Sequence, residues 1–315
     1  YLLSNGKGAI IPVFLQEKLY PYIVVANLDA NAVSRSSEGN IYLAAEITLE
    51  QIEQYFAELI DSRQSVEWNT AEQRVEARQV RSIGNIVIEE VSASQQDRAA
   101  VQQCLLKAIY DAGLLCLNWS EQALNLQQRI QFINANCQDY PTVEKQLASE
   151  SLPDFSEENL LDTLDDWLLP YLKDENSFRQ CQKIDLYKVL ANQLSWQQQQ
   201  MVEQLAPEKF TVPSGSSIRI DYSDPRSPVL AVRLQEVFGL NETPAVLDGN
   251  IKLMMHLLSP ARRPMQVTQD LNSFWQSTYH EVKKELRGKY KKHYWPDDPF
   301  TAQATSKTKK NMDKH

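Results

Sequence analysis

The sequence predicts an α+β protein built in successive parts, and three features of its patterning lead to this class. Short runs of alternating apolar and polar residues, separated by turn residues, fill residues 1–92 and are typical of strands. Residues 93–206 carry apolar residues at helical spacing. Residues 207–300 combine strand runs with one long helical pattern. We therefore expect a small β domain, a helical region and an α+β C-terminal domain, which suits a length of 315 residues.

The β domain over 1–92 is expected to contain six short strands and one helix. The helix covers 48–60, where Thr48 is a suitable N-cap and apolar residues follow at helical spacing. Short strands interrupted by one helix favour a small OB-like barrel, and a simple sandwich fits nearly as well. The predicted strands are 9–14, 20–30, 40–47, 65–69, 73–83 and 85–92.

The helical region over 93–206 is divided by capping and stop signals. A first helix ends at Gly113, a residue type that often terminates helices. Helices are then predicted to begin at Ser120 and Ser156, and a last helical pattern over 185–207 stops at Pro207. The acidic residues after Ser156 lie near a helix start or on its wet face, so we interpret them as solvated.

The C-terminal domain over 207–300 begins with a predicted hairpin at 210–222, followed by a helix or strand-helix segment ending near Gly239 and a strand over 251–260. A helix is expected over 269–287, capped by Thr268 or Asp270 and stopped by Gly288. The polar, lysine-rich residues 301–315 are expected to be a disordered tail.

Several classes of function are disfavoured by what the sequence lacks. With only nine glycines, it contains no glycine-rich phosphate loop, and no serine lies in a nucleophile motif. The four cysteines form no CxxC pair and the four histidines have no metal-ligand spacing, so we predict no metal site. We expect the cysteines to be free thiols of a protein in the reducing cytosol and not to form disulfides. We find no signal peptide and no membrane-length apolar run, which indicates a cytoplasmic protein without a membrane partner. We expect no catalytic residue, since an independent hydrolase would need converging titratable groups.

Charge is distributed unevenly along the chain. Residues 251–315 carry 13 Lys and Arg against 6 Asp and Glu, whereas residues 1–250 carry 19 against 35. The acidic total, a net charge of −9, therefore conceals a basic C-terminal segment, which indicates an anionic partner.

The strongest candidate for a binding site is a cluster of cations and rings in this basic segment. "SPARRP" at 259–264 places two arginines between two prolines, which limit the movement of the loop. Cations that neutralise phosphates and aromatic rings that stack on bases suit single-stranded or structured RNA. A structural interpretation stays open, because cations are favoured at helix C-termini and the rings can serve packing. The candidate nucleic-acid-binding residues are Arg262, Arg263, Lys283, Lys284, Arg287, Lys289, Lys291, Lys292 and Trp295.

A family resemblance is carried by "VPSGSSIRIDY", "PVLAVRLQEVFGL" and "TPAVLDGNIKLMMHLLSPARRPMQVTQDLNSFWQSTYHEVKKELRGKYKKHYWPDDP". These stretches resemble the C-terminal region of HrpB-type bacterial ATP-dependent helicases, relatives of the DEAH/RHA group. "YLLSNGKGA", "LNWSEQALNLQQRIQF" and "WLLPYL" resemble the stretch that precedes it. The resemblance is dense over 207–299 and looser over 1–100.

The resemblance implies a parent protein with two RecA-like motor domains, a winged helix and a helical bundle, followed by an OB-like domain and a C-terminal domain. This chain, which opens at Tyr1, is expected to be a piece holding the last two. ATP and Mg²⁺ are implied only for the motor, because no phosphate-binding loop, DExH box or arginine finger occurs here. No catalytic residue is therefore carried over.

We thus expect an accessory nucleic-acid-binding module of an RNA helicase, with RNA and the motor domains of the same polypeptide as partners. The alternative is a protein-interaction or docking module that positions the motor without touching RNA. The two readings differ over Arg262 and Arg263: exposure beside other cations favours RNA, and pairing with Asp297 or Asp298 favours docking.

Overall fold

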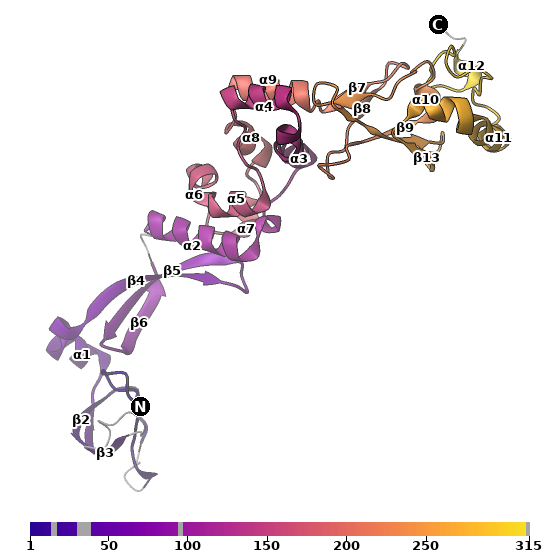
Figure 1. Cartoon of the computed structure of the whole chain (residues 1–315). Helices are drawn as coiled ribbons and strands as arrows, with labels where there is room; N and C mark the ends of the chain where they lie inside the picture. Colours follow the sequence, from indigo (N-terminus) through magenta and orange to yellow (C-terminus); the bar gives the residue numbers. More distant parts are fainter. Residues whose placement is uncertain (14–17, 30–38, 94–96, 313–315) are drawn as a thin grey trace. The chain divides into compact units, whose positions relative to one another are not determined.

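The computed structural model describes residues 1–13, 18–29, 39–93 and 97–312, and forms two compact units. The first unit comprises residues 1–111 and 172–181, and the second comprises 112–171 and 182–315. Figure 1 shows the order of the elements along the chain. Strands, helices and several small sheets occur together, so the α+β class is confirmed. The predicted domain boundaries stay predictions.

The first unit begins with a three-stranded sheet. β3 (Gly39–Glu46) lies in its centre, parallel to β1 (Ala9–Ile10) and antiparallel to β2 (Ile23–Leu28). The helix α1 (Leu49–Tyr55) follows, and a short 3₁₀ turn over Ala57–Leu59 ends this segment. Thr48 caps α1 as expected, through a capping box with Gln51.

A second sheet in this unit is an antiparallel meander of β4 (Asp61–Asn69), β5 (Arg74–Ile83) and β6 (Ile86–Ser92). The six predicted strands are thus present, but the described residues form two separate three-stranded sheets and not a closed OB-like barrel. The reason is that strand pairing stays local: β4 and β6 both pair with β5, and neither forms a ladder with β1–β3. Alternation along a strand fixes which face is buried, but it does not specify the neighbouring strand.

Two helices complete the first unit, α2 (Arg98–Ala112) and α7 (Phe178–Cys181). The segment before α7 joins the meander, since the Val75 backbone N–H donates to the Asn176 carbonyl at 2.7 Å. The rings of Trp68 and Phe178 pack with their centroids 4.5 Å apart. α2 buries Leu105 and Ile109 along one face, as its helical pattern predicts.

The second unit opens with short helices around α3. α3 (Glu121–Asn136), capped by Ser120, packs against α8 (Leu186–Ala191) and α9 (Trp196–Leu205). The predicted helix after Ser156 is broken at Thr163, where regular helical bonding stops. The remaining helical elements here are 3₁₀ Leu114–Cys116, 3₁₀ Cys137–Asp139, α4 (Pro141–Ser149), α5 (Glu157–Asp162), α6 (Leu164–Trp167) and 3₁₀ Leu169–Tyr171.

The C-terminal part of the second unit contains the predicted hairpin, β7 (Lys209–Thr211) with β8 (Ser217–Arg219). β9 (Val229–Arg233) precedes a 3₁₀ turn at Leu234–Glu236 and pairs in parallel with β12 (Met254–Leu258). β13 (Pro264–Thr268) pairs antiparallel with the other side of β12. A small hairpin, β10 (Ala245–Val246) with β11 (Ile251–Lys252), precedes this sheet.

A helical segment capped by Asp270 follows β13 and carries the basic residues. It consists of α10 (Leu271–Ser273), a π-helical turn at Phe274–Thr278, and α11 (Tyr279–Lys289). Its aromatic side chains build the local core, where Trp275 and Tyr279 pack around the fully buried Phe238. Gly288 does not stop the helix: it lies inside α11 without a positive φ, and Tyr290 is the C-cap.

The tail also differs from expectation. The Thr305 backbone N–H donates to the Gln235 carbonyl at 2.9 Å, and Gln235 Nε2 donates to the carbonyls of Thr305 and Lys307. The chain then forms the short helix α12 (Lys309–Met312). Residues 301–312 thus have defined contacts where composition predicts a disordered tail, because the buried Gln235 supplies polar partners that composition does not reveal. Residues 313–315 lie outside the described residues.

Candidate nucleic-acid interface

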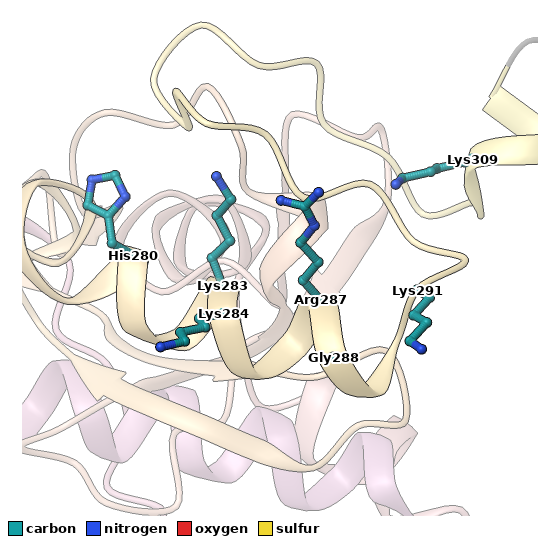
Figure 2. Close-up of a pocket in the computed structure, with 7 residues that line it drawn as sticks. All are labelled: His280, Lys283, Lys284, Arg287, Gly288, Lys291 and Lys309. Carbon is teal, nitrogen blue, oxygen red and sulfur yellow. The ribbon is translucent and has the colours of Figure 1, made fainter.

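A cavity of about 480 Å³ lies beside α11 and is lined almost entirely by basic side chains. Figure 2 shows His280, Lys283 and Arg287 rising from one side of α11, while Lys309 reaches toward Arg287 from α12. No acidic residue is among those that line the cavity. The lining residues are His280, Lys283, Lys284, Arg287, Gly288, Lys291 and Lys309.

The helical period explains why these side chains meet. Positions 280, 283/284, 287 and 291 are separated by three or four residues, so they follow one stripe of the helix and its continuation. The core residues Tyr279, Val282 and Leu286 lie on the neighbouring face of the helix, each one position before a residue of the basic stripe. Burial of that apolar stripe therefore leaves the basic stripe as the outer wall. The negative end of the helix dipole further favours cations in the last turn.

Lys283 differs from the other lining residues, because it is held by an acid. It is only 9% exposed, and its ammonium donates to the carboxylate of Asp297. This hydrogen bond, with smaller contributions from Arg287 and His280, keeps the pKa of Asp297 below its usual value. The sequence prediction of Lys283 as a contact thus meets a side chain already paired within the protein.

Lys309 enters the cavity from a segment that the sequence indicated as disordered. Its backbone N–H donates to the Lys292 carbonyl at 3.0 Å, which fixes the start of α12 near the end of α11. Lys291 lines the cavity, whereas the exposed Lys292 and Lys310 do not. Adjacent lysines in the sequence are therefore separated into lining and non-lining positions.

The arginine pair lies in the tight turn between β12 and β13. The Arg262 backbone N–H donates to the Ser259 carbonyl at 2.9 Å, and the Ser259 N–H donates to the Arg263 carbonyl at 2.8 Å. The Arg263 N–H donates to Ser259 Oγ at 3.1 Å, and Tyr290 OH donates to the same atom at 3.4 Å. The buried Ser259 thus organises the turn and connects it to the residue that caps α11.

Arg262 has φ of +60°, in the left-handed region. A short hairpin with a bulge usually places glycine at such a position, because a side chain there costs about 1–2 kcal/mol. The chain accepts this cost and places a long cationic side chain at the tip. Both arginines are exposed.

The acids proposed as partners for these arginines are engaged elsewhere. Asp297 accepts from Lys283, while Asp298 accepts from the Thr301 hydroxyl at 2.6 Å and from the Phe300 backbone N–H at 2.9 Å. Within the described residues, neither Arg262 nor Arg263 forms an ion pair. Arg262 and Arg263 are therefore available to an external anion and do not form the pairs with Asp297 or Asp298 that the docking alternative requires.

Two further predicted residues lie outside this arrangement. Lys289 forms an exposed i,i+4 ion pair with Glu285 at 2.7 Å, which is worth little. Trp295 is 7% exposed, and its indole N–H donates to the Tyr290 carbonyl at 3.1 Å. Its ring belongs to the core, so it is not positioned to stack on a base; alternation of rings with lysines in the sequence did not distinguish packing from display.

Of the nine predicted residues, the fold brings four to the cavity: Lys283, Lys284, Arg287 and Lys291. Sequence analysis missed His280, although its spacing from Lys283 and Lys284 was a usable signal. It also missed Lys309, for which no local pattern existed. Across the described ranges, no group of His, Cys, Asp and Glu could hold a metal ion, and no described helix is both long and apolar enough to cross a membrane.

Comparison with known proteins connects this region to one family. Residues 167–299, which include the arginine turn and most of the cavity, match the family model described as "ATP-dependent helicase C-terminal" (HrpB_C). The chain is also 34% identical over 310 residues to the ATP-dependent RNA helicase HrpB of Escherichia coli strain K12. That alignment covers 98% of this chain and 37% of the relative, so the chain spans little more than a third of the relative's length.

Solved structures agree with this assignment. The crystal structure of the E. coli DExH-box NTPase HrpB is similar with a TM-score of 0.62 and 34% identity, covering 98% of this chain and 37% of that one. A crystal structure of the E. coli DEAH/RHA helicase HrpB gives a TM-score of 0.53 and 30% identity, covering 94% and 35%. The chain is thus similar over nearly its whole length to part of HrpB-type ATP-dependent helicases, and its residues 167–299 match the C-terminal domain of that family.

Proposed function

We propose that this chain is the accessory nucleic-acid-binding region of a cytoplasmic ATP-dependent RNA helicase, and that it holds the phosphate backbone of RNA. The motor domains of the same polypeptide would bind ATP and Mg²⁺ and supply the driving force. The observation that carries this proposal is the cavity lined by five Lys and Arg side chains and one histidine, with no acidic lining residue.

The chemistry of the lining favours phosphate over bases. Lysine and arginine side chains are hydrogen-bond donors without acceptors, whereas base edges present both donors and acceptors. Cations that neutralise phosphates release counterions, which gives affinity that depends on salt and not on sequence. We therefore expect a grip on the backbone that tolerates many sequences, as a translocating helicase requires.

The arginine turn extends this surface in our proposal. Arg262 and Arg263 lie in a turn connected through Tyr290 to the end of α11, and both side chains are exposed. The planar guanidinium can donate two parallel hydrogen bonds to one phosphate. The turn and the cavity would then contact different phosphates of one strand.

The test is fluorescence anisotropy of the chain with a labelled single-stranded RNA across a salt series. We expect log affinity to fall linearly with log salt, with a slope of about −0.7 for each neutralised phosphate. The variant Lys284→Glu/Arg287→Glu removes two cavity cations that form no ion pair in the described structure. It should bind at least about tenfold more weakly, with a slope shallower by about 1.4.

A matched control carries the same charge change elsewhere. Lys145 and Lys183 are exposed lysines of the same unit, away from the residues that line the cavity. Lys145→Glu/Lys183→Glu should retain most of the affinity. Equal losses in both variants would show a diffuse charge effect and no site. Absence of salt-dependent binding in the unmodified chain would exclude the proposal and favour a docking role toward the motor or another protein.

A further inference from the structure

The cavity is two-sided, and the second side comes from the C-terminal segment. Lys309 faces Arg287 across the cavity, although 22 positions separate them in sequence. Residues 301–312 are held in place by hydrogen bonds with the buried Gln235, and by the bond from Lys309 N–H to the Lys292 carbonyl. The position of Lys309 is thus fixed by backbone contacts and not by its own side chain.

Gln235 is fully committed to this arrangement. It is 1% exposed, its Nε2 donates to the Thr305 and Lys307 carbonyls at 2.8 and 3.1 Å, and its Oε1 lies 2.7 Å from His293 Nδ1. A buried amide with every group satisfied specifies one geometry, because any displacement leaves polar atoms unpaired. The segment therefore forms a fixed wall at the C-terminal end of α11.

At this end, two cations face each other: Lys309 points toward Arg287, whereas the Lys291 side chain, which also lines the cavity, points away from both. A single phosphodiester carries one negative charge and needs fewer contacts than these cations offer. A terminal phosphate monoester carries about −1.5 to −2 charges at pH 7 and three acceptor oxygens. Its gain from several converging donors is correspondingly larger.

We propose that the end of the cavity between Arg287 and Lys309 binds a terminal phosphate of an RNA strand, with the segment 301–312 supplying Lys309 as the second contact. The basic stripe along α11 would then hold the backbone that leads to this end. This inference rests on the proposed function and adds to it a preferred substrate: strands that end in a phosphate over strands that end in a hydroxyl.

The experiment compares RNAs of one sequence that carry a 5′-hydroxyl, a 5′-phosphate or a 3′-phosphate, using anisotropy with the full chain. One of the phosphorylated ends should raise the affinity by about fivefold over the hydroxyl form. Pyrophosphate as competitor should reduce binding of that RNA to the level of the hydroxyl form. Equal affinity for all three ends, or no effect of pyrophosphate on the difference, would overturn the inference.

Adjacent lysines supply the matched variants. Lys309 lines the cavity and Lys310 does not, and both are exposed. Lys309→Glu should abolish the preference for the phosphorylated end, and Lys310→Glu should retain it. The same effect from both variants would contradict a specific contact.

A second variant tests the wall without changing any charge. Gln235→Ala removes the side-chain bonds that hold the segment, so the preference should fall while all cations remain. Thermal unfolding reports whether the Gln235→Ala variant is folded. If it is unfolded, the comparison of Lys309→Glu with Lys310→Glu tests the inference instead. Failure of the two proposals is distinguishable: salt-dependent binding with no end preference rejects the inference alone, whereas no binding of any RNA rejects the proposed function.

Discussion

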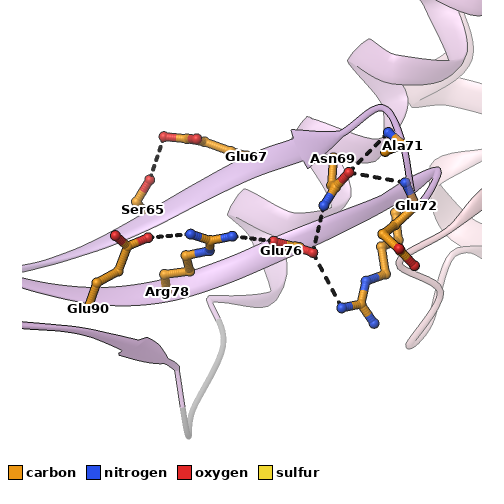
Figure 3. A network of polar contacts seen from close by, with 9 residues as sticks. Ser65, Glu67, Asn69, Ala71, Glu72, Glu76, Arg78 and Glu90 are labelled. Carbon is orange, nitrogen blue, oxygen red and sulfur yellow. Dashed lines mark hydrogen bonds and ion pairs between the residues drawn. The ribbon is translucent and has the colours of Figure 1, made fainter.

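Arginines on the β4–β6 meander of the first unit and cations around α11 in the second unit have different neighbours. On the meander, Arg78 donates to Glu76 on its own strand and to Glu90 on β6. Arg81 pairs with Glu53 and Glu89. Figure 3 shows the Arg78 part of this network, in which the Arg78 guanidinium lies between the carboxylates of Glu90 and Glu76.

These pairings alter the protonation of the acids. Hydrogen bonds, first from Arg78 and then from Asn69, lower the pKa of Glu76 to about 2. In return, the carboxylates of Glu90 and Glu76 raise the pKa of Arg78. The positive charges of Arg78 and Arg81 are thus already neutralised by the protein, and a phosphate would have to displace a carboxylate.

Around α11 the balance is reversed. Asp297 neutralises Lys283, but no other cavity cation forms an ion pair in the described residues. Arginine and lysine content alone therefore does not locate an interface; the number of acids within reach of each cation does. Strand neighbours provide such acids on the meander, whereas the sequence near α11 offers few.

The substitution with the largest expected effect tests whether the Trp295 ring is part of the core or part of the RNA interface. Trp295→Ala should destabilise the second unit by about 3–5 kcal/mol, because the indole is buried and its N–H is bonded to Tyr290. Chemical denaturation measures this loss. Trp295→Phe retains most of the packing and should leave RNA affinity nearly unchanged. A large loss of RNA affinity in a stably folded Trp295→Phe variant would place the ring in the interface and break the comparison.

The next effect compares the arginines themselves. Arg262→Ala/Arg263→Ala should lower RNA affinity about tenfold, since it removes two available guanidinium groups. Arg74→Ala/Arg78→Ala removes the same number of charges from the meander, where both arginines pair with Glu76. That variant should change affinity by less than about twofold. Anisotropy at one low salt concentration suffices, and the reverse order would disprove our distinction between paired and available cations.

A smaller effect concerns the strain at the turn. Arg262→Gly should stabilise the second unit by about 0.5–1 kcal/mol, because glycine adopts the positive φ without a steric penalty. The same variant should weaken RNA binding by removing a cation. Arg263→Gly is the control: its φ is not positive, so it should bring no gain in stability. Denaturation midpoints of the two variants measure the difference, and a destabilised Arg262→Gly would show that its side chain has a structural partner.

Much of the fold followed from local patterns, and the failures were non-local. Alternation and helical spacing identified all six strands of the first unit and the helix that carries the basic stripe. They could not show that β4 and β6 pair only with β5, because strand pairing depends on contacts between distant residues. Local patterns also did not reveal the contacts of the tail, because its partner Gln235 lies 70 positions before Thr305.

The candidate site shows the same limit. The helical period of Lys284, Arg287 and Lys291 could be read from the sequence, and the structure places these residues in one cavity. The pairing of Lys283 with Asp297 could not be read from the sequence, because 14 positions and a turn separate the two residues. The burial of Trp295 likewise depends on tertiary packing.

The smallest predicted effect measures the pairing on the meander directly. The carboxyl of Glu76 should titrate near pH 2, and Arg78→Ala should raise its pKa toward the ordinary value because the largest contribution is lost. Carboxyl carbon shifts in an NMR pH titration report this pKa. Arg63→Ala on the neighbouring strand β4 is the control, since Arg63 makes no ion pair with Glu76, and it should leave the titration unchanged.

The same pKa fixes the direction of a pH effect on stability. Because folding lowers the pKa of Glu76, its contribution to stability is complete above its unfolded value near 4.5 and disappears as the pH falls toward about 2. Glu76→Gln should flatten the pH dependence of unfolding of the first unit in this window. An unshifted Glu76 pKa would mean that Arg78 is not neutralised in solution, and the arginines of the meander would then be as available to phosphate as those of the β12–β13 turn.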